Sequence, residues 1–309
     1  MDLSQMPTYV PGFRDECNLR DMGGMLAMDG RVMTRGLVFR SGALGNLNKV
    51  ELNNLRNLHL SYVLDLRTAA EARRNPDPNL PGVQQVRVCG ATDAAGHEIN
   101  MSPLGFIRLA MHPRRRDPDR QPNRVASIAG LYSSLAFDNP AYRELFKQLE
   151  AGNVPLLFHC SQGKDRTGIA AMLVLAALGY DEDVIVDRYV LTNEYRRESL
   201  SHAIDGHRVI MSRLPILRLI AQFAEGVIRE FGERVFEEIH QQYGTLEKYF
   251  EAEFGLDAER LAALRDFYLH EPGEEPKVQG RPRPRPKHAR PIAAATGDSP
   301  SDSPSEAES

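Results

Sequence analysis

The chain has 309 residues, of which 42% are hydrophobic and 26% are charged, and its formal net charge is −4. These proportions are ordinary for a globular protein and exclude a fibrous or wholly disordered chain, while the acidic balance argues against a dedicated nucleic-acid-binding protein. The three cysteines are too few and too scattered for a disulfide framework or a zinc site, so we expect free thiols and no metal.

Short strands alternate with helices in the first half of the chain. The predicted elements are a hairpin over residues 24–33 that turns at Asp29-Gly30, a strand over 37–40, a helix over 44–58, a strand over 62–66, a helix that starts after Thr68, and a strand over 83–89. Such alternation indicates a mostly parallel sheet that helices cover on both faces.

The second half is mostly helical. Its predicted elements are a helix over residues 127–150 with a break at Asn139-Pro140, a buried strand over 155–158, an apolar helix over 169–178, and several helices over 181–269 with ends at Gly244, Gly255 and Pro272. The fold class that we expect is therefore α/β: a central sheet flanked by helices, with an additional, mostly helical C-terminal half.

Composition divides the chain near residue 270. Residues 271–309 are rich in Pro, Glu, Ser and Arg and hold almost no large apolar side chain, which is typical of a solvated tail. Residues 1–270 suffice for one large α/β domain. The Arg-Pro repeat at 281–286 makes the tail either a docking segment for a partner or a plain solubilising extension.

Neither a membrane span nor a secretory signal is expected. The longest apolar run, residues 169–178, extends about 15 Å as a helix, which is half of a bilayer core. The first residues lack a basic region followed by an apolar core. We expect a cytoplasmic protein, and contact of the basic residues 114–116 with an anionic surface is left open.

The strongest chemical signal is the segment HCSQGKDRTG at residues 159–168, which lies between the buried strand and the apolar helix. A strand-to-helix turn brings together backbone N–H groups and the positive end of the helix dipole, which suits an anion. Cys160 opens the turn, where such surroundings lower the pKa of a thiol from about 8.5 and favour the thiolate at neutral pH. Arg166 follows six residues later, and its planar guanidinium can bind two oxygens of a phosphate.

These parts predict nucleophilic displacement at phosphorus. The thiolate of Cys160 attacks a phosphate ester, and the loop amides with Arg166 stabilise the equatorial oxygens. The residues expected to bind the phosphate are Ser161, Gln162, Gly163, Lys164, Asp165 and Arg166. Water then releases phosphate from the phosphocysteine. Because the loop amides and Arg166 supply the positive charge, we expect the reaction to require no metal or other cofactor.

The same segment resembles the signature of a known family, the tyrosine/serine phosphatases among the cysteine-dependent protein tyrosine phosphatases, whose loop reads HCxxGKDRTG. Similar blocks are NLRDMGG at residues 18–24, FRSG at 39–42 and LDLRT at 64–68, and the resemblance covers about residues 13–270. It implies a single α/β phosphatase domain over residues 1–270. It also implies activity on phosphotyrosine, with phosphoserine, phosphothreonine and phosphoinositides as further substrates.

Two residues are candidates for the general acid that protonates the leaving oxygen. Asp93 follows a predicted strand on a separate loop, as the acid does in many phosphatases of this broad class. The GKDR pattern of the resembled family points instead to Asp165, inside the phosphate-binding loop. We favour Asp165 and keep Asp93 as the alternative.

Two further residues, Thr167 and His159, are expected to support the reaction, and Lys164 has a second interpretation besides binding the phosphate. Thr167 can donate a hydrogen bond to the thiolate. Lys164 either binds extra phosphates, as on an inositol ring, or balances the charge of Asp165. His159 lacks partners at metal-ligand spacing in the sequence, so we interpret it as a buried imidazole bound to backbone rather than as a metal ligand.

Charged residues outside the loop are interpreted mainly as structural. Arg20 and Asp21 are expected to buttress the site or the sheet edge, and Asp65 with Arg67 to form an ion pair at a strand end. Residues 199–229 form either a lid over the loop or a permanently packed cap.

The function that we predict is a metal-independent phosphatase for phosphotyrosine, and also for phosphoserine or phosphothreonine, with a phosphorylated protein as its partner. Two alternatives stay open. One is a phosphoinositide phosphatase with the same chemistry, and the other is a phosphate-binding interaction module without turnover.

Overall fold

The computed structural model describes residues 6, 8–92, 96–99, 130, 132–205 and 226–274 of the chain. The predictions made for Asp93, for residues 114–116, for the middle of the 199–229 segment and for the tail beyond residue 274 lie outside these residues.

A five-stranded sheet forms the centre of the molecule. In spatial order its strands are β1 (Arg20–Asp21), β3 (Val38–Ser41), β6 (Leu156–His159), β4 (Tyr62–Asp65) and β5 (Gln84–Arg87). β1 is antiparallel to β3, and the other neighbours are parallel. Every residue of β6 is buried. Because ligands bind at the carboxyl ends of parallel strands, the loop that leaves β6 starts at the favoured place.

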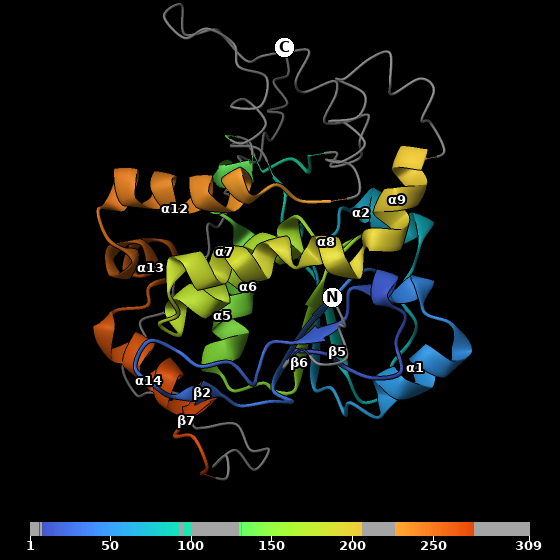
Figure 1. The fold of residues 1–309 in the computed structure, drawn as a ribbon, viewed down its shortest axis with the longest axis horizontal. Helices are drawn as coiled ribbons and strands as arrows, with labels where there is room; N and C mark the ends of the chain where they lie inside the picture. Colours follow the sequence, from blue (N-terminus) through green and yellow to red (C-terminus); the bar gives the residue numbers. More distant parts are fainter. Residues whose placement is uncertain are drawn as a thin grey trace, which may run out of the picture.

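Two apolar clusters cover the two faces of the sheet, as the alternation of strands and helices predicts. Leu157 of β6 packs with Leu55 and Phe39 on one face, under α1 (Lys49–Arg56). Phe158 belongs to the larger cluster on the other face, which includes α5 (Pro140–Glu150) and α6 (Arg166–Ala177). Figure 1 shows these helices on opposite sides of the strands.

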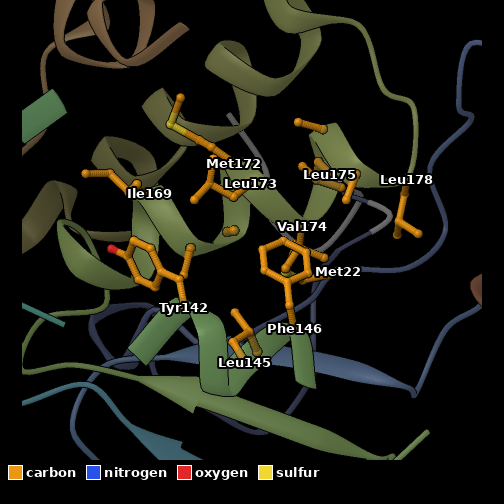
Figure 2. Packing of buried hydrophobic residues seen from close by; sticks show 14 of the residues in the cluster. Met22, Tyr142, Leu145, Phe146, Ile169, Met172, Leu173, Val174, Leu175 and Leu178 are labelled. Atoms are coloured by element: carbon orange, nitrogen blue, oxygen red, sulfur yellow. The ribbon is translucent and has the colours of Figure 1, made fainter. Parts of the chain in front are cut away.

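α6 is the central helix, and all twelve of its residues are buried. Figure 2 shows Tyr142, Leu145 and Phe146 of α5 beside the apolar residues of α6. On its other side α6 packs on α7 (Glu182–Val190), which in turn packs on α12 (Arg229–Tyr243). Since α6 is enclosed, its first residue, Arg166, is fixed in place.

The helices of the first half are shorter than the leucine pattern suggests. Residues 44–58 contain a 3-10 turn, η3 (Leu44–Asn46), and then α1, which begins after Asn48 because the side chains of Asn48 and Glu51 form a reciprocal capping box. α2 (Ala69–Arg74) starts after Thr68 as predicted. A further 3-10 turn, η2, spans Asp15–Cys17.

The remaining helices confirm a mostly helical C-terminal half. They are α8 (Thr192–Tyr195), α9 (Arg197–Asp205), α13 (Leu246–Phe254) and α14 (Ala258–Tyr268). α12 ends at Gly244 and α13 at Gly255, both with positive φ, as expected. None of the helices in the described ranges has the length and apolar character that crossing a bilayer requires.

One small sheet was not predicted. β7 (Leu269–His270) pairs in antiparallel register with β2 (Val32–Met33), which belongs to the hairpin over residues 24–33. That hairpin is present, since Leu26 bridges Val32 and the chain turns through Gly30. A strand of two residues is too short to show an alternation of apolar and polar side chains, so the sequence did not predict β7.

Candidate active site

The segment predicted to bind phosphate, called the phosphate-binding loop below, starts at Cys160 after β6 and ends at Arg166, the first residue of α6, at the carboxyl edge of the sheet. Cys160 is only 1% exposed, and Arg166, at the start of α6, is 3% exposed. The loop between them is therefore placed by a strand and a helix whose residues are all buried. This is the strand–loop–helix arrangement that the sequence predicts for residues 159–168.

At two positions in and beside the loop, neighbouring groups lie too close to the backbone to leave room for a Cβ, so that only glycine fits there. Gly163 has a φ of 69°, and a Cβ there would lie 2.7 Å from backbone atoms of Ser41 and Gly42. A Cβ on Gly168 would lie 2.9 Å from the ring of Tyr189 on α7. The first glycine lets the loop approach the end of β3 closely, and the second lets α6 pack against α7.

Side chains from the first 40 residues hold the loop backbone. The Asn18 amide donates to the carbonyls of Gln162 (3.2 Å) and Gly163 (2.9 Å). Arg40 Nη2 donates to the carbonyl of Gly163 at 2.6 Å. The sequence reasoning assigned no role to Asn18 or Arg40, although both lie in blocks that carried the family resemblance.

Arg166 forms a two-pronged ion pair with Glu71 of α2. Nη1 lies 2.7 Å from Oε2, and Nη2 lies 2.7 Å from Oε1. The hydroxyl of Ser161 donates to Glu71 Oε1 at 2.6 Å. Burial alone would raise the pKa of Glu71, but its hydrogen bond with Arg166 and the positive charge of Arg166 lower that pKa to about 2.

Glu71 is the main functional residue that sequence reasoning missed. Its carboxylate also accepts from the backbone N–H of Thr68, and the two residues form the capping box that starts α2. The spacing Thr-x-x-Glu was readable as such a box. A capping box gives no indication that the same carboxylate reaches a loop some 90 residues away.

Asp165 lies among buried polar groups. Its Oδ1 accepts a hydrogen bond from the Tyr132 hydroxyl and lies 3.0 Å from Lys164 Nζ. Burial raises the pKa of Tyr132, so its hydroxyl keeps the proton that it donates. The ion pair agrees with the charge-balance interpretation of Lys164, which also donates to the carbonyl of Gly226 at 3.2 Å.

His159 is fully buried behind the loop. Its Nε2 lies 3.0 Å from Asp77 Oδ2, and its Nδ1 lies 3.3 Å from the carbonyl of Cys160 and 4.0 Å from Asp65 Oδ1. The backbone contact agrees with the prediction. Donor atoms of Asp65, Asp77 and His159 also lie within 4.8 Å of one another, a proximity in space that the spacing of these residues in the sequence did not indicate.

Arg67 forms ion pairs with both carboxylates of this cluster. Its guanidinium lies 2.8 Å from Asp65 Oδ1 and 2.8 Å from Asp77 Oδ2, which confirms the predicted Asp65–Arg67 ion pair and adds Asp77. Burial alone would raise the pKa of Asp77, but the contacts with His159 and Arg67 lower it. Since one cation already serves both carboxylates, the cluster is best described as a buried ion network.

The remaining predicted residues take supporting places. Arg20 donates to Thr192 Oγ1 at 2.9 Å, and Asp21 accepts from the backbone of Gly23 (2.8 Å) and of Gly36 (2.7 Å), so both are buttresses as expected. The Thr167 hydroxyl is buried and has no hydrogen-bond partner in the described part of the chain. Its bond to the Cys160 thiolate stays a prediction.

Comparison with known proteins agrees with this geometry. Residues 12–270 match the model of the tyrosine phosphatase family. A Cupriavidus necator protein whose name assigns it as a tyrosine-protein phosphatase is 26% identical over 260 residues, which cover 82% of this chain and 85% of that protein. The triple specificity protein phosphatase PtpB of Mycobacterium tuberculosis is 33% identical over 175 residues, which cover 52% of this chain and 62% of PtpB.

Among solved structures, the core catalytic domain of the PP-IP phosphatase SIW14 from S. cerevisiae, in complex with citrate, has a TM-score of 0.29 and 15% identity. The match covers 56% of this chain and 76% of that chain. A similarity this low supports no conclusion about substrate.

Proposed function

Because the chain belongs to the tyrosine phosphatase family and is a phosphatase, we propose that it hydrolyses phosphotyrosine in proteins through a phosphocysteine intermediate on Cys160. The observation that carries this proposal is the position of Cys160 and Arg166 at the two ends of one loop, on the carboxyl edge of the sheet. A binding module needs the cation but not the thiol, which favours the enzyme over the non-catalytic alternative.

In the first step the thiolate attacks phosphorus. The S–P bond forms while the bond from phosphorus to the tyrosyl oxygen breaks, and that oxygen takes a proton from the Asp165 carboxyl. The loop amides and Arg166 stabilise the charge on the equatorial oxygens. Glu71 supports this role because its two contacts at 2.7 Å fix the plane of the guanidinium.

In the second step water attacks phosphorus, and the S–P bond breaks. Asp165, now a carboxylate, accepts the proton from that water, and Cys160 leaves as a thiolate. The Thr167 hydroxyl, which has no other partner among the described residues, is placed next in sequence to Arg166 and can donate to the departing sulfur.

The domain that performs this reaction is proposed to span residues 1–270, with the tail outside it. The family match ends at residue 270, where β7 closes the small sheet. Phosphoinositides are the second candidate substrate, because Lys164 is a second loop cation. Lys164 is 2% exposed and paired with Asp165, which favours the protein substrate.

The test is phosphate release from a panel of phosphotyrosyl, phosphoseryl and phosphothreonyl peptides and phosphoinositides, with Cys160→Ser as the control. We expect the highest kcat/KM on phosphotyrosyl peptides and no turnover by Cys160→Ser. A higher kcat/KM on phosphoinositides than on phosphopeptides would contradict the proposed protein substrate and favour phosphoinositides. Binding of phosphopeptide by the wild type without any phosphate release would support the interaction module.

A further inference from the structure

Asn18 is a fully buried asparagine that lies beside the phosphate-binding loop. It has a φ of 52° at the end of the 3-10 turn η2, where its backbone N–H donates to the carbonyl of Asp15 at 2.8 Å. Asparagine tolerates this left-handed conformation better than most residues do. The carbonyl of Cys17, the preceding residue, accepts from the backbone N–H of Gly42 at 2.8 Å, which ties the turn to the end of β3. The backbone on both sides of the loop contact is therefore fixed.

The side-chain amide of Asn18 forms hydrogen bonds only through its nitrogen in the described part of the chain. Nδ2 donates to the carbonyls of Gln162 and Gly163, at 3.2 and 2.9 Å, whereas Oδ1 is buried and has no partner there. An unpaired buried acceptor is unfavourable, so the two bonds to the loop must offset that cost. The amide is thus directed entirely at two neighbouring carbonyls of the loop.

The loop backbone is held at a third carbonyl as well. The backbone N–H of Ala43 donates to the carbonyl of Ser161 at 3.1 Å, and Arg40 Nη2 adds a second bond to the carbonyl of Gly163. Three successive carbonyls, those of residues 161–163, therefore accept hydrogen bonds from groups outside the loop.

Fixed carbonyls determine where the loop amides point. In a planar trans peptide the C=O of one residue and the N–H of the next point in opposite directions. Because the carbonyls of residues 161–163 are held from outside, the N–H groups of residues 162–164 are turned to the opposite side. Gly163, with its φ of 69°, supplies the left-handed residue of a backbone nest, in which successive N–H groups bind an anion. The proposed reaction needs such donors for the equatorial oxygens of the phosphoryl group.

We propose that Asn18 is a positioning residue for phosphate binding: by holding the carbonyls of Gln162 and Gly163, it turns the N–H groups of the two following residues toward the oxygens of the phosphate. This inference rests on the proposed function, because it uses the same loop as the anion site. Asn18 contacts the backbone of the loop and acts through it. Loss of the amide leaves the donors present but less well aligned, so a phosphate-like anion and the transition state both bind more weakly.

The experiment compares tungstate binding to the full chain and to two variants by isothermal titration calorimetry. Tungstate is a phosphate-like dianion that is not hydrolysed, so its Kd reports the alignment of the donors without turnover. Asn18→Gly removes the amide and suits the left-handed φ. Asn139→Ala is the matched control. Asn139 is also buried, and its Nδ2 donates to two backbone carbonyls outside the loop, those of Gly90 (3.2 Å) and Leu135 (2.7 Å).

For Asn18→Gly we expect the Kd of tungstate to rise about tenfold and kcat/KM on p-nitrophenyl phosphate to fall about 100-fold, because the amides contribute most where charge develops in the transition state. For Asn139→Ala, both values should stay within about twofold of wild type at a temperature where the variant is folded. A purely structural asparagine lowers stability without changing either value, so urea titration of both variants separates the two roles.

A folded Asn18→Gly with the wild-type Kd for tungstate would overturn the inference, as would an equal rise in Asn139→Ala. If Asn18→Gly does not fold, backbone amide NMR spectra of the wild type decide. The N–H signals of Gly163 and Lys164 should shift when tungstate is added, and unchanged signals would overturn the inference.

Failure of the proposed function has a different signature. The wild type would then release no phosphate from any ester, while tungstate would still bind to the loop and Asn18→Gly would still weaken that binding.

Discussion

Two ion networks support the phosphate-binding loop, and they differ in what they hold. The front network joins Arg166, Glu71 and Ser161, and the Glu71 side chain keeps 22% of its surface exposed. The rear network joins His159, Asp77, Asp65 and Arg67 and is almost fully enclosed. The front network contains Arg166, which we propose binds the phosphate, whereas the rear network contains no residue of the proposed reaction. On this proposal, similar ion pairs serve catalysis in the front network and stability in the rear network.

The largest expected effect is that of Asp165→Asn, within the loop that both networks support. An amide cannot donate the proton that a poor leaving group needs, so we expect kcat/KM on phenyl phosphate or a phosphotyrosyl peptide to fall by about 10²–10⁴-fold. An activated ester such as p-nitrophenyl phosphate should lose much less. Equal losses on both kinds of substrate would remove Asp165 from the role of general acid and direct attention to Asp93.

Glu71→Gln tests whether the front network serves catalysis. The variant loses the charge that holds both prongs of Arg166, and we expect kcat/KM to fall by about 100-fold because the guanidinium is no longer aligned. Glu98→Gln is the control, since Glu98 forms an ion pair with Arg87 at 2.8 Å outside the loop. Comparable activity of Glu71→Gln and Glu98→Gln would contradict the assignment.

Asp77→Asn tests the rear network. The substitution leaves His159 and Arg67 with one carboxylate fewer in a buried place, so we expect the free energy of unfolding to fall by about 3 kcal/mol in urea titration. At a temperature where the variant is folded, kcat/KM should stay within about threefold of wild type. A stable variant with a large loss of activity would reverse the distinction between the two networks.

The last prediction concerns the effect of acid on stability. Glu71 has a pKa of about 2 in the folded chain and an ordinary pKa of 4.5, so its ionised form stabilises the fold. That contribution, of about 3 kcal/mol, is complete above pH 4.5 and is lost as the pH falls toward 2. The difference in unfolding free energy between wild type and Glu71→Gln should therefore shrink between pH 5 and pH 3. If this difference in unfolding free energy stays constant with pH, the ion pair of Glu71 with Arg166 is not its cause.

The sequence predicted the parts of the site that are local in the chain. β6, α6 and the loop between them were readable because an apolar run, a glycine-containing turn and a second apolar run follow one another within residues 155–178.

The parts that come from distant segments were not predictable in the same way. Asn18, Arg40, Glu71 and Asp77 reach the loop from elements that lie about 80 to 145 residues earlier, and no local spacing encodes such contacts. The pairing of β7 with β2 is of the same kind. These contacts arise from the order of strands in the sheet, which a single sequence does not display.

Covalent transfer of phosphate to Cys160 is tested most directly by rapid acid quench of the wild-type enzyme during turnover of a phosphotyrosyl peptide. Mass spectrometry of the peptide that contains residue 160 should show the added mass of one phosphoryl group on Cys160. The Cys160→Ser variant should show neither this adduct nor phosphate release. Turnover by Cys160→Ser, or a phosphoryl group trapped on another residue of the wild type, would contradict the mechanism.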